Sequence, residues 1–316
     1  MSLPTINDVQ AVEPVLNNLL IGYRQAADDF VASKVFPGVS VPHDSGTYYI
    51  FDKRYWFSDA MKRRAPGGDF ATADFGTSSG TYSTIQWALS FVLADEVRAN
   101  SLVPMDLETA AIQWLALKSL IRKEIAFSTD FMASGVWGTS GSVTAKFSDY
   151  AASDPVTDIL TAKRTIRANT GANANMAVCG EIVEHRLLNH PDLIDRMKYQ
   201  QVASMGNVQA TLGSALGLDL VVGRASYNAT NEYTTMTSGT AIIDDDILIC
   251  YSAPAPGIFT ASAGYTFYWP GGGGLGIVRP TYRNEANDAD VIKTKEQWDQ
   301  VAVATDLGYF YADCTD

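Results

Sequence analysis

Few residues in this chain have the type and spacing that catalysis or metal binding requires. The histidines are His43, His185 and His190, and no cluster of cysteines or carboxylates completes a metal-ligand spacing around them. No pair of a nucleophilic cysteine and a histidine base is recognisable either. We therefore interpret the histidines as structural or exposed, and we expect no catalytic residue, no metal and no cofactor.

Two short motifs have the composition of ligand sites but not their context. The glycines from Gly271 to Gly274 lack the Lys-Ser/Thr pair and the following helix of a phosphate-binding loop, so we interpret them as a turn. The aspartates from Asp244 to Asp246 could hold a cation. They lie between the apolar sequences AII and ILIC, however, which is typical of a turn between two strands.

Composition indicates a globular chain rather than a nucleic-acid-binding one. The chain has 316 residues, 47% hydrophobic and 18% charged, which fits one large or two ordinary domains. Its net charge of −12 argues against a general nucleic-acid binder. Three scattered cysteines without C-x-x-C spacing favour a reduced, cytoplasmic setting. No secretory leader is recognisable, so we expect the native start to be retained.

The element around which the chain is organised is one long amphipathic helix, predicted over 104–132. Its apolar residues form two adjoining stripes at helical spacing: Leu107, Ala111, Trp114, Leu117, Ile121 and Ile125, with Ile112, Leu115, Leu120 and Phe127 beside them. We predict that Asp106 caps the helix and that Gly135 follows its end.

The width of the apolar surface predicts that this helix is the core of the subunit, with Trp114 buried. Four charged residues are expected to keep the remaining sector in water: Lys118, Arg122, Lys123 and Glu124. These charges also argue against a membrane span, which needs about 20 mostly apolar residues.

The residues before the helix predict an arm and a hairpin. Residues 1–45 read as an extended arm with a short helix at 26–35. Its apolar residues Val31, Val35, Phe36 and Val39 have no evident local partner, so we expect them to be buried only against a neighbouring subunit.

Strands are predicted at 47–52 and 81–93, on either side of a long polar segment. Such a loop is uncommon in a compact domain unless it has a function. Its basic residues are Lys53, Arg54, Lys62, Arg63 and Arg64. Two interpretations remain open: a solvated loop, or a hairpin that reaches a neighbouring subunit.

The second half of the chain alternates helices and strands. We predict helices at 155–169, 181–188 and 193–199, and strands at 176–179, 218–227, 240–253 and 264–269. Residues 299–313 predict a final pair of strands with a turn near Asp306.

This order of elements resembles that of tailed-bacteriophage major capsid proteins with the Hong Kong 97-like fold. The segments that carry the resemblance are 26–41, 49–56 with the following KRRAPG, 87–100, the long helix, and 294–311. The resemblance implies an α+β fold with an N-terminal arm (1–45), an extended E-loop (46–98), a P domain with the spine helix (99–170), an A domain (171–282) and closing P-domain strands (283–316).

The resemblance also implies a function. Such a protein self-assembles as hexamers and pentamers into the icosahedral shell of a virion, made in the host bacterial cytoplasm. The shell encloses double-stranded DNA without sequence recognition and has no membrane. The expected partners are a separate scaffolding protein, a portal and a decoration protein, and we expect no covalent cross-link. The expected intersubunit contacts are Lys53, Arg54, Trp56, Lys62, Arg63 and Arg64, with Val35 and Phe36 from the arm.

Two alternatives remain open at this point. One is a bacterial nanocompartment shell of the same fold, which would enclose enzyme cargo. The other is a soluble α/β hydrolase that uses a pair of Asp or Glu residues, although no such pair has an identifiable site in the sequence.

Overall fold

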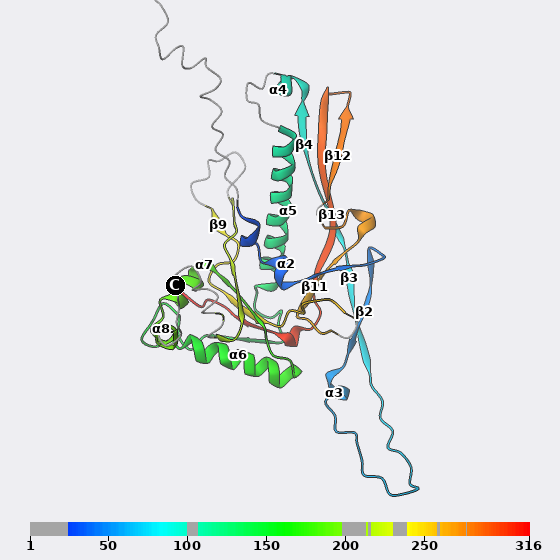
Figure 1. The fold of residues 1–316 in the computed structure, drawn as a ribbon, viewed down its shortest axis with the longest axis vertical. Coiled ribbons are helices and arrows are strands. Elements are labelled where there is room, and N and C mark those ends of the chain that lie inside the picture. Colours follow the sequence, from blue (N-terminus) through cyan, green and yellow to red (C-terminus); the bar gives the residue numbers. More distant parts are fainter. Residues whose placement is uncertain are drawn as a thin grey trace, which may run out of the picture.

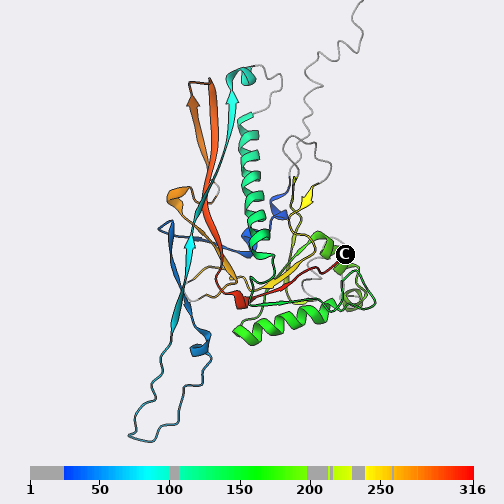
Figure 2. The same cartoon turned by 180° about the vertical axis from the view of Figure 1, so that it is seen from behind.

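The computed structural model describes residues 25–99, 107–197, 213, 216–229, 239–257, 260–275 and 277–316. The molecule is elongated. Helix α5 (Leu107–Phe131) runs beside three long strands, β4 (Ile85–Ala94), β12 (Ile277–Asn284) and β13 (Ala289–Ala302), as Figures 1 and 2 show from opposite sides. A hairpin projects from the other end of the molecule. No described helix is both long and apolar enough to cross a membrane.

The first sheet forms the spine of the molecule. Its strand order is β1 (Gly38–Ser40), β11 (Gly264–Tyr268), β13, β12, and β4 pairs with the opposite edge of β13. The register runs from Ala94 opposite Ala289 to Ile85 opposite Trp298. Alternate residues of β13 are therefore directed toward α5, and Ile292 is buried against Ala111 and Leu115 of the helix.

The second sheet forms the main core. Its order is β5 (Thr139–Gly141), β14 (Gly308–Tyr311), β10 (Ile247–Cys250), β6 (Met176–Gly180) and β7 (Asp219–Gly223). All four residues of β10 are buried, as expected for a central strand that is apolar throughout. The second sheet is accompanied by α6 (Pro155–Thr170), α7 (Glu181–Leu188) and α8 (Pro191–Met197), and a small pair of strands, β8 (Ser226–Tyr227) and β9 (Thr240–Ala241), lies outside it.

The predicted helices and strands of this half are largely confirmed. Helix α6 begins after a capping aspartate, because Asp154 accepts the backbone N–H of Thr157. It ends at Gly171, whose φ of +72° favours glycine. The expected pairing of the last two strands is wrong, because both edges of β13 are already occupied by other strands. The turn at Thr305–Leu307 instead passes the chain from the first sheet to the second.

The long helix is confirmed over Leu107–Phe131, whereas Asp106 lies outside the described residues. Two details of its surface are wrong. Trp114 is 42% exposed, and Lys123 and Glu124, expected in water, are buried. Only Lys118 and Arg122 of the expected charged sector are exposed. The polar groups that cover Lys123 and Glu124 come from segments far away in the sequence, so helical spacing carried no sign of them.

The arm also departs from expectation. It forms a 3-10 turn at Ala27–Asp29 and a short helix, α2 (Ala32–Val35), rather than one helix. Val31, Val35 and Phe36 are fully buried in the core of their own subunit. The Phe36 ring lies 5.3 Å from the Phe127 ring and 4.8 Å from the Phe131 ring. The expectation that Val35 and Phe36 lack a local partner is therefore wrong, because the end of α5 provides one.

The projecting hairpin consists of β2 (Ser45–Phe51) and β3 (Thr77–Ser83), paired from Ser45–Ser83 to Phe51–Thr77. The single strand predicted at 81–93 is thus two strands, β3 and β4. Beyond the short helix α3 (Lys53–Trp56), residues 57–76 form neither helix nor strand, and α4 (Asp95–Ala99) follows β4.

Candidate subunit interface

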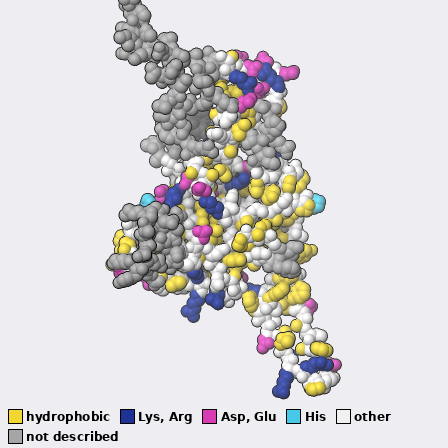
Figure 3. All heavy atoms as spheres, in the orientation of Figure 1, with side chains coloured by type: hydrophobic (Ala, Val, Ile, Leu, Met, Phe, Trp, Pro, Cys, Tyr) yellow, Lys and Arg dark blue, Asp and Glu magenta, His cyan; other side chains and the backbone are white. Residues whose placement is uncertain are grey.

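The hairpin exposes an unusual amount of apolar surface. Met61 is 92% exposed and Phe70 is 76% exposed. Other large exposed side chains of the hairpin are Tyr49, Tyr55, Trp56, Phe57 and Phe75. Figure 3 shows hydrophobic and basic atoms together on this projection. Because a two-stranded hairpin is at best marginally stable alone, and exposed apolar patches mark contact sites, this surface indicates a partner.

The root of the hairpin is fixed to its own subunit. The rings of Tyr48 and Tyr82 stack on Phe267 of β11, at centroid distances of 5.7 and 4.9 Å. Burial, and secondarily the Asp299 carboxylate, raises the pKa of Tyr48. Lys53 forms a salt bridge with Asp306. The hairpin therefore leaves the body in a defined direction.

The expected contact residues divide into two groups. Lys53 pairs with Asp306, and Arg54 pairs with Asp52 at 2.7 Å. The Arg54 backbone N–H and guanidinium hold the pKa of Asp52 below its usual range. Arg64 donates to the carbonyl of Gly68, and its guanidinium lies 4.0 Å from the centre of the Phe70 ring.

Lys62 and Arg63 differ from these three basic residues. Both are exposed, and neither forms an ion pair with another residue of the described part of the chain. Of the five basic residues predicted to face a neighbour, these two are thus available for it in the isolated subunit.

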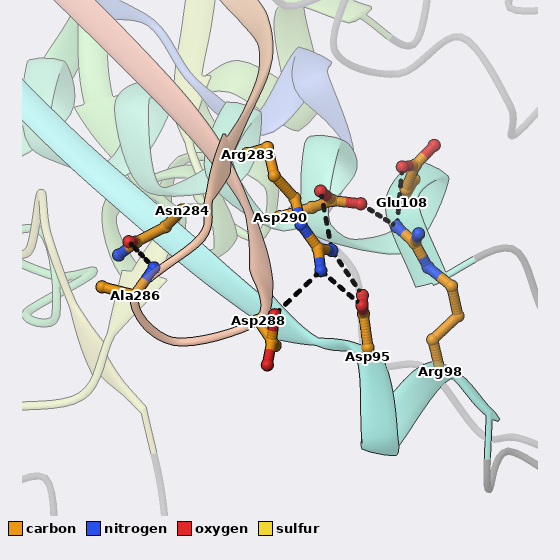
Figure 4. Close-up of polar contacts among 8 residues, drawn as sticks. All are labelled: Asp95, Arg98, Glu108, Arg283, Asn284, Ala286, Asp288 and Asp290. Carbon is orange, nitrogen blue, oxygen red and sulfur yellow. Dashed lines mark hydrogen bonds and ion pairs between the residues drawn. The ribbon is translucent and has the colours of Figure 1, made fainter.

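The other end of the molecule carries an ion-pair network that ties four elements together: α4, α5, β12 and β13 (Figure 4). Arg283 of β12 binds Asp95 with two hydrogen bonds of 2.7 and 2.6 Å, and also approaches Asp288. Arg98 of α4 bridges Asp290 at 2.8 Å and Glu108 at 3.0 Å. The Arg283 hydrogen bonds hold the pKa of Asp95 below its usual range. Four carboxylates around two guanidinium groups leave this end of the spine acidic.

The spine also has exposed apolar side chains beside a free strand edge. Among the described residues, β4 pairs with β13 alone, so its outer edge is unpaired. On the side of β4 that faces α5, the exposed apolar residues are Ile85 and Leu89, with Ile112 and Trp114 of α5 beside them. Exposed Val92 lies on the opposite face of β4, and exposed Val97 lies on α4. Among the described residues, the buried Trp87 indole N–H has no hydrogen-bond partner. The spine thus has a second apolar surface, separate from that of the hairpin.

One serine–histidine–aspartate grouping was missed in the sequence. Ser153 Oγ lies 2.9 Å from His190 Nε2, and His190 Nδ1 lies 3.7 Å from Asp192. The Ser153 hydroxyl donates to the Asp149 carbonyl, and Nδ1 accepts the Asp192 backbone N–H. His190 therefore carries its proton on Nε2 and faces the serine as a donor, not as a base. Ser153 and His190 are buried, Asp192 is exposed, and the group lies at the start of helix α8, which is a structural role.

A second serine matches a nucleophile motif by letters alone. Gly76-Thr77-Ser78-Ser79-Gly80 has the G-x-S-x-G spacing, but a nucleophile elbow needs a turn between a strand and a helix. Ser78 lies inside β3, where its hydroxyl donates to the carbonyl of Ile50. Among the described residues, no histidine or carboxylate is hydrogen-bonded to the Ser78 hydroxyl, so the motif lacks the geometry of a nucleophile elbow.

The two candidate ligand motifs of the sequence, the aspartates 244–246 and the glycines 271–274, also have structural roles. Asp246 accepts the backbone N–H of Asp313, and burial raises the pKa of Asp245 and of Asp246. The glycines from Gly271 to Gly274 form a turn, where Gly272 approaches Gln297 too closely to leave space for a Cβ. Burial raises the pKa of Cys179 and of Cys250 to about 12, which makes both thiols unreactive. Within the described ranges, no group of three potential ligands could hold a metal ion.

Comparison with known proteins agrees with this geometry. No protein-family model matches the chain. The major capsid protein of Burkholderia phage BcepMu is 29% identical over 201 residues, 61% of this chain and 63% of that protein. The chain thus matches less than two thirds of the length of this curated relative.

Solved structures match along almost the whole chain. A phage-related protein from Bordetella bronchiseptica has a TM-score of 0.69 at 23% identity, covering 93% of this chain and 94% of that one. The capsid of the cyanophage P-SCSP1u has a TM-score of 0.60 at 11% identity, covering 94% and 91%. In sequence, this chain is thus similar to a phage major capsid protein, and its α+β fold matches those of a phage-related protein and a phage capsid.

Proposed function

We propose that the chain is a major capsid protein that self-assembles into the icosahedral head shell around the double-stranded DNA of a tailed phage. The observation that carries this proposal is the pair of unlike apolar surfaces: the hairpin at one end of the molecule, and the β4–α5 face of the spine at the other. Two different surfaces on one chain are suited to head-to-tail contacts, which close into rings when repeated by rotation.

We further propose how the two surfaces are shared between subunits. The hairpin of one subunit lies across the spine of the next and covers Trp56 and its neighbours. Lys62 and Arg63 approach the acidic spine end formed by Asp95, Asp288 and Asp290. Arg54 and Arg64 act within the hairpin, where their partners hold it in shape, and Lys53 ties the hairpin root to Asp306 of the body.

The remaining features of the proposal follow from the function. In the proposed shell, residues 1–45 act as the N-terminal arm, 46–98 as the E-loop and 99–170 as the P domain. Residues 171–282 act as the A domain, and 283–316 as the closing P-domain strands. A net charge of −12 suits a wall that encloses DNA without binding it tightly. A separate scaffolding protein, a portal and a decoration protein would complete the particle, assembled in the bacterial cytoplasm.

We expect the double variant Lys62→Glu/Arg63→Glu to remain a soluble subunit that does not form shells. Exposed ion pairs contribute only about 0–1 kcal/mol each, but symmetry repeats them at every contact, and reversed charges repel the acidic spine. Velocity sedimentation of the purified protein measures the assembled fraction.

Arg164→Glu/Arg167→Glu is the matched control, because both arginines are exposed on α6 and the variant has the same change in net charge. Shells from the control but not from the hairpin variant support the proposal. Shells from both variants would show that the hairpin cations are not needed, and loss of shells in both would point to total charge alone.

The nanocompartment alternative has the same contacts but different contents. Nuclease treatment of opened particles distinguishes the two functions, because a phage head releases DNA and a compartment releases enzyme cargo. No described grouping of residues favours the hydrolase alternative.

A further inference from the structure

Glu124 binds the N-terminal arm from the middle of the spine helix. Its side chain is fully buried. Its two carboxylate oxygens accept the backbone N–H of Val31 at 3.1 and 3.0 Å, and Oε2 also accepts that of Ala32 at 2.9 Å. These residues are 93 and 92 positions away in the sequence.

The carboxylate takes the place of a missing helix cap. Val31 is the N-cap residue of α2 and has no side chain that could accept a hydrogen bond. The first N–H groups of a helix need an acceptor, and negative charge is favourable there. Glu124 thus supplies from α5 the cap that the sequence of the arm lacks.

Burial at the same site disfavours the ionised form of the Glu124 carboxyl group. Burial raises the pKa of Glu124 to about 7, although the hydrogen bonds from Ala32 and Val31 and the charge of Lys34 oppose this shift. The other charged groups nearby are already engaged. Lys34 lies 3.9 Å from Asp28, Lys123 pairs with Glu296, and Arg224 pairs with Glu184.

We propose that Glu124 is a proton-dependent clasp that holds residues 25–34 of the arm on the spine helix. When the clasp opens, the carboxyl group enters water and regains its ordinary acidity. The closed state therefore binds a proton that the open state releases between about pH 4.5 and pH 7. Closing is favoured at the acidic end of this window and weakens as the pH rises through it.

The purpose of such a clasp rests on the proposed shell function. An arm that is released near neutral pH becomes available to a neighbouring subunit, whereas a protonated clasp keeps it on its own chain. The clasp itself belongs to the single subunit. It is measurable without assembly, so its failure and the failure of the shell proposal are distinguishable.

The test is amide hydrogen exchange of Val31 and Ala32 in the full-length unassembled subunit between pH 5 and pH 8, corrected for the intrinsic rate. Over this pH range, the opening equilibrium is expected to rise by about 70-fold, the ratio that follows from a carboxyl pKa of 4.5 in the open state and about 7 in the closed state. Amides of the buried strand β6 serve as an internal reference for global unfolding.

The variant Glu124→Gln should remove the pH dependence, and the exposed control Glu96→Gln should retain it. The wild-type profile alone decides the matter if Glu124→Gln does not fold. An opening equilibrium that stays flat, or that falls as the pH rises, would overturn the proposal, because Glu124 would then remain ionised inside the closed arm.

Discussion

Replacing Glu296 with alanine is expected to lower the free energy of unfolding by about 3–5 kcal/mol, since it leaves a buried cation without its partner. Glu296 of β13 lies 3.2 Å from the Lys123 ammonium and accepts hydrogen bonds from the Ser119 hydroxyl and the Trp298 indole. Both charged side chains are almost completely buried between α5 and the first sheet. Denaturant unfolding followed by circular dichroism measures the loss.

The control for this prediction is Glu108→Ala, which removes a half-exposed partner of Arg98 and should cost about 0–1 kcal/mol. The double variant Lys123→Met/Glu296→Leu should recover much of the loss, because it removes both charges and keeps the volume. An equal, small effect of Glu296→Ala and Glu108→Ala would mean that water reaches the Lys123 ammonium.

The second large effect is expected at Phe36, where Phe36→Ala should destabilise the subunit by about 3–5 kcal/mol. Its ring is fully buried among Phe127, Phe131 and Trp137. Trp114→Ala should cost clearly less, about 1–2 kcal/mol, because 42% of that residue is exposed and its ring contacts mainly Phe91. Thermal unfolding of the unassembled subunits measures both.

The comparison of these two variants decides where the arm belongs. A Phe36→Ala subunit as stable as the wild type would show that the arm leaves its own core in solution. A Trp114→Ala subunit that unfolds as readily as Phe36→Ala would instead restore Trp114 to the core of the isolated chain.

Local sequence patterns predicted the regular elements well. Helices α5, α6 and α7 all lie within the ranges that were predicted from the sequence, to within one to three residues at their ends. The charged face of α5 was harder to predict, because the sequence alone does not distinguish a buried Lys123 or Glu124 from a solvated one. The difference depends on the partner of each residue. Val31, the partner of Glu124, is 93 residues away, and Glu296, the partner of Lys123, is farther still.

The candidate interface was predictable only in part. Two predicted strands on either side of a long polar loop indicated the hairpin, but the basic residues of that loop gave no sign that Lys62 and Arg63 differ from Lys53. The partner of Lys53 is 253 residues away, so only the fold brings it near. The short spacing of Asp52 and Arg54, in contrast, was a local signal that could have predicted their pairing.

The central claim is that the hairpin of one subunit covers the spine of another in a closed shell. Electron cryo-microscopy of purified particles tests it most directly. We predict icosahedral shells filled with DNA, in which residues 57–76 lie on the β4–α5 face of a neighbouring subunit and Lys62 and Arg63 approach its acidic spine end. Shells in which the hairpin contacts no neighbour, or a protein that remains monomeric under assembly conditions, would contradict the account.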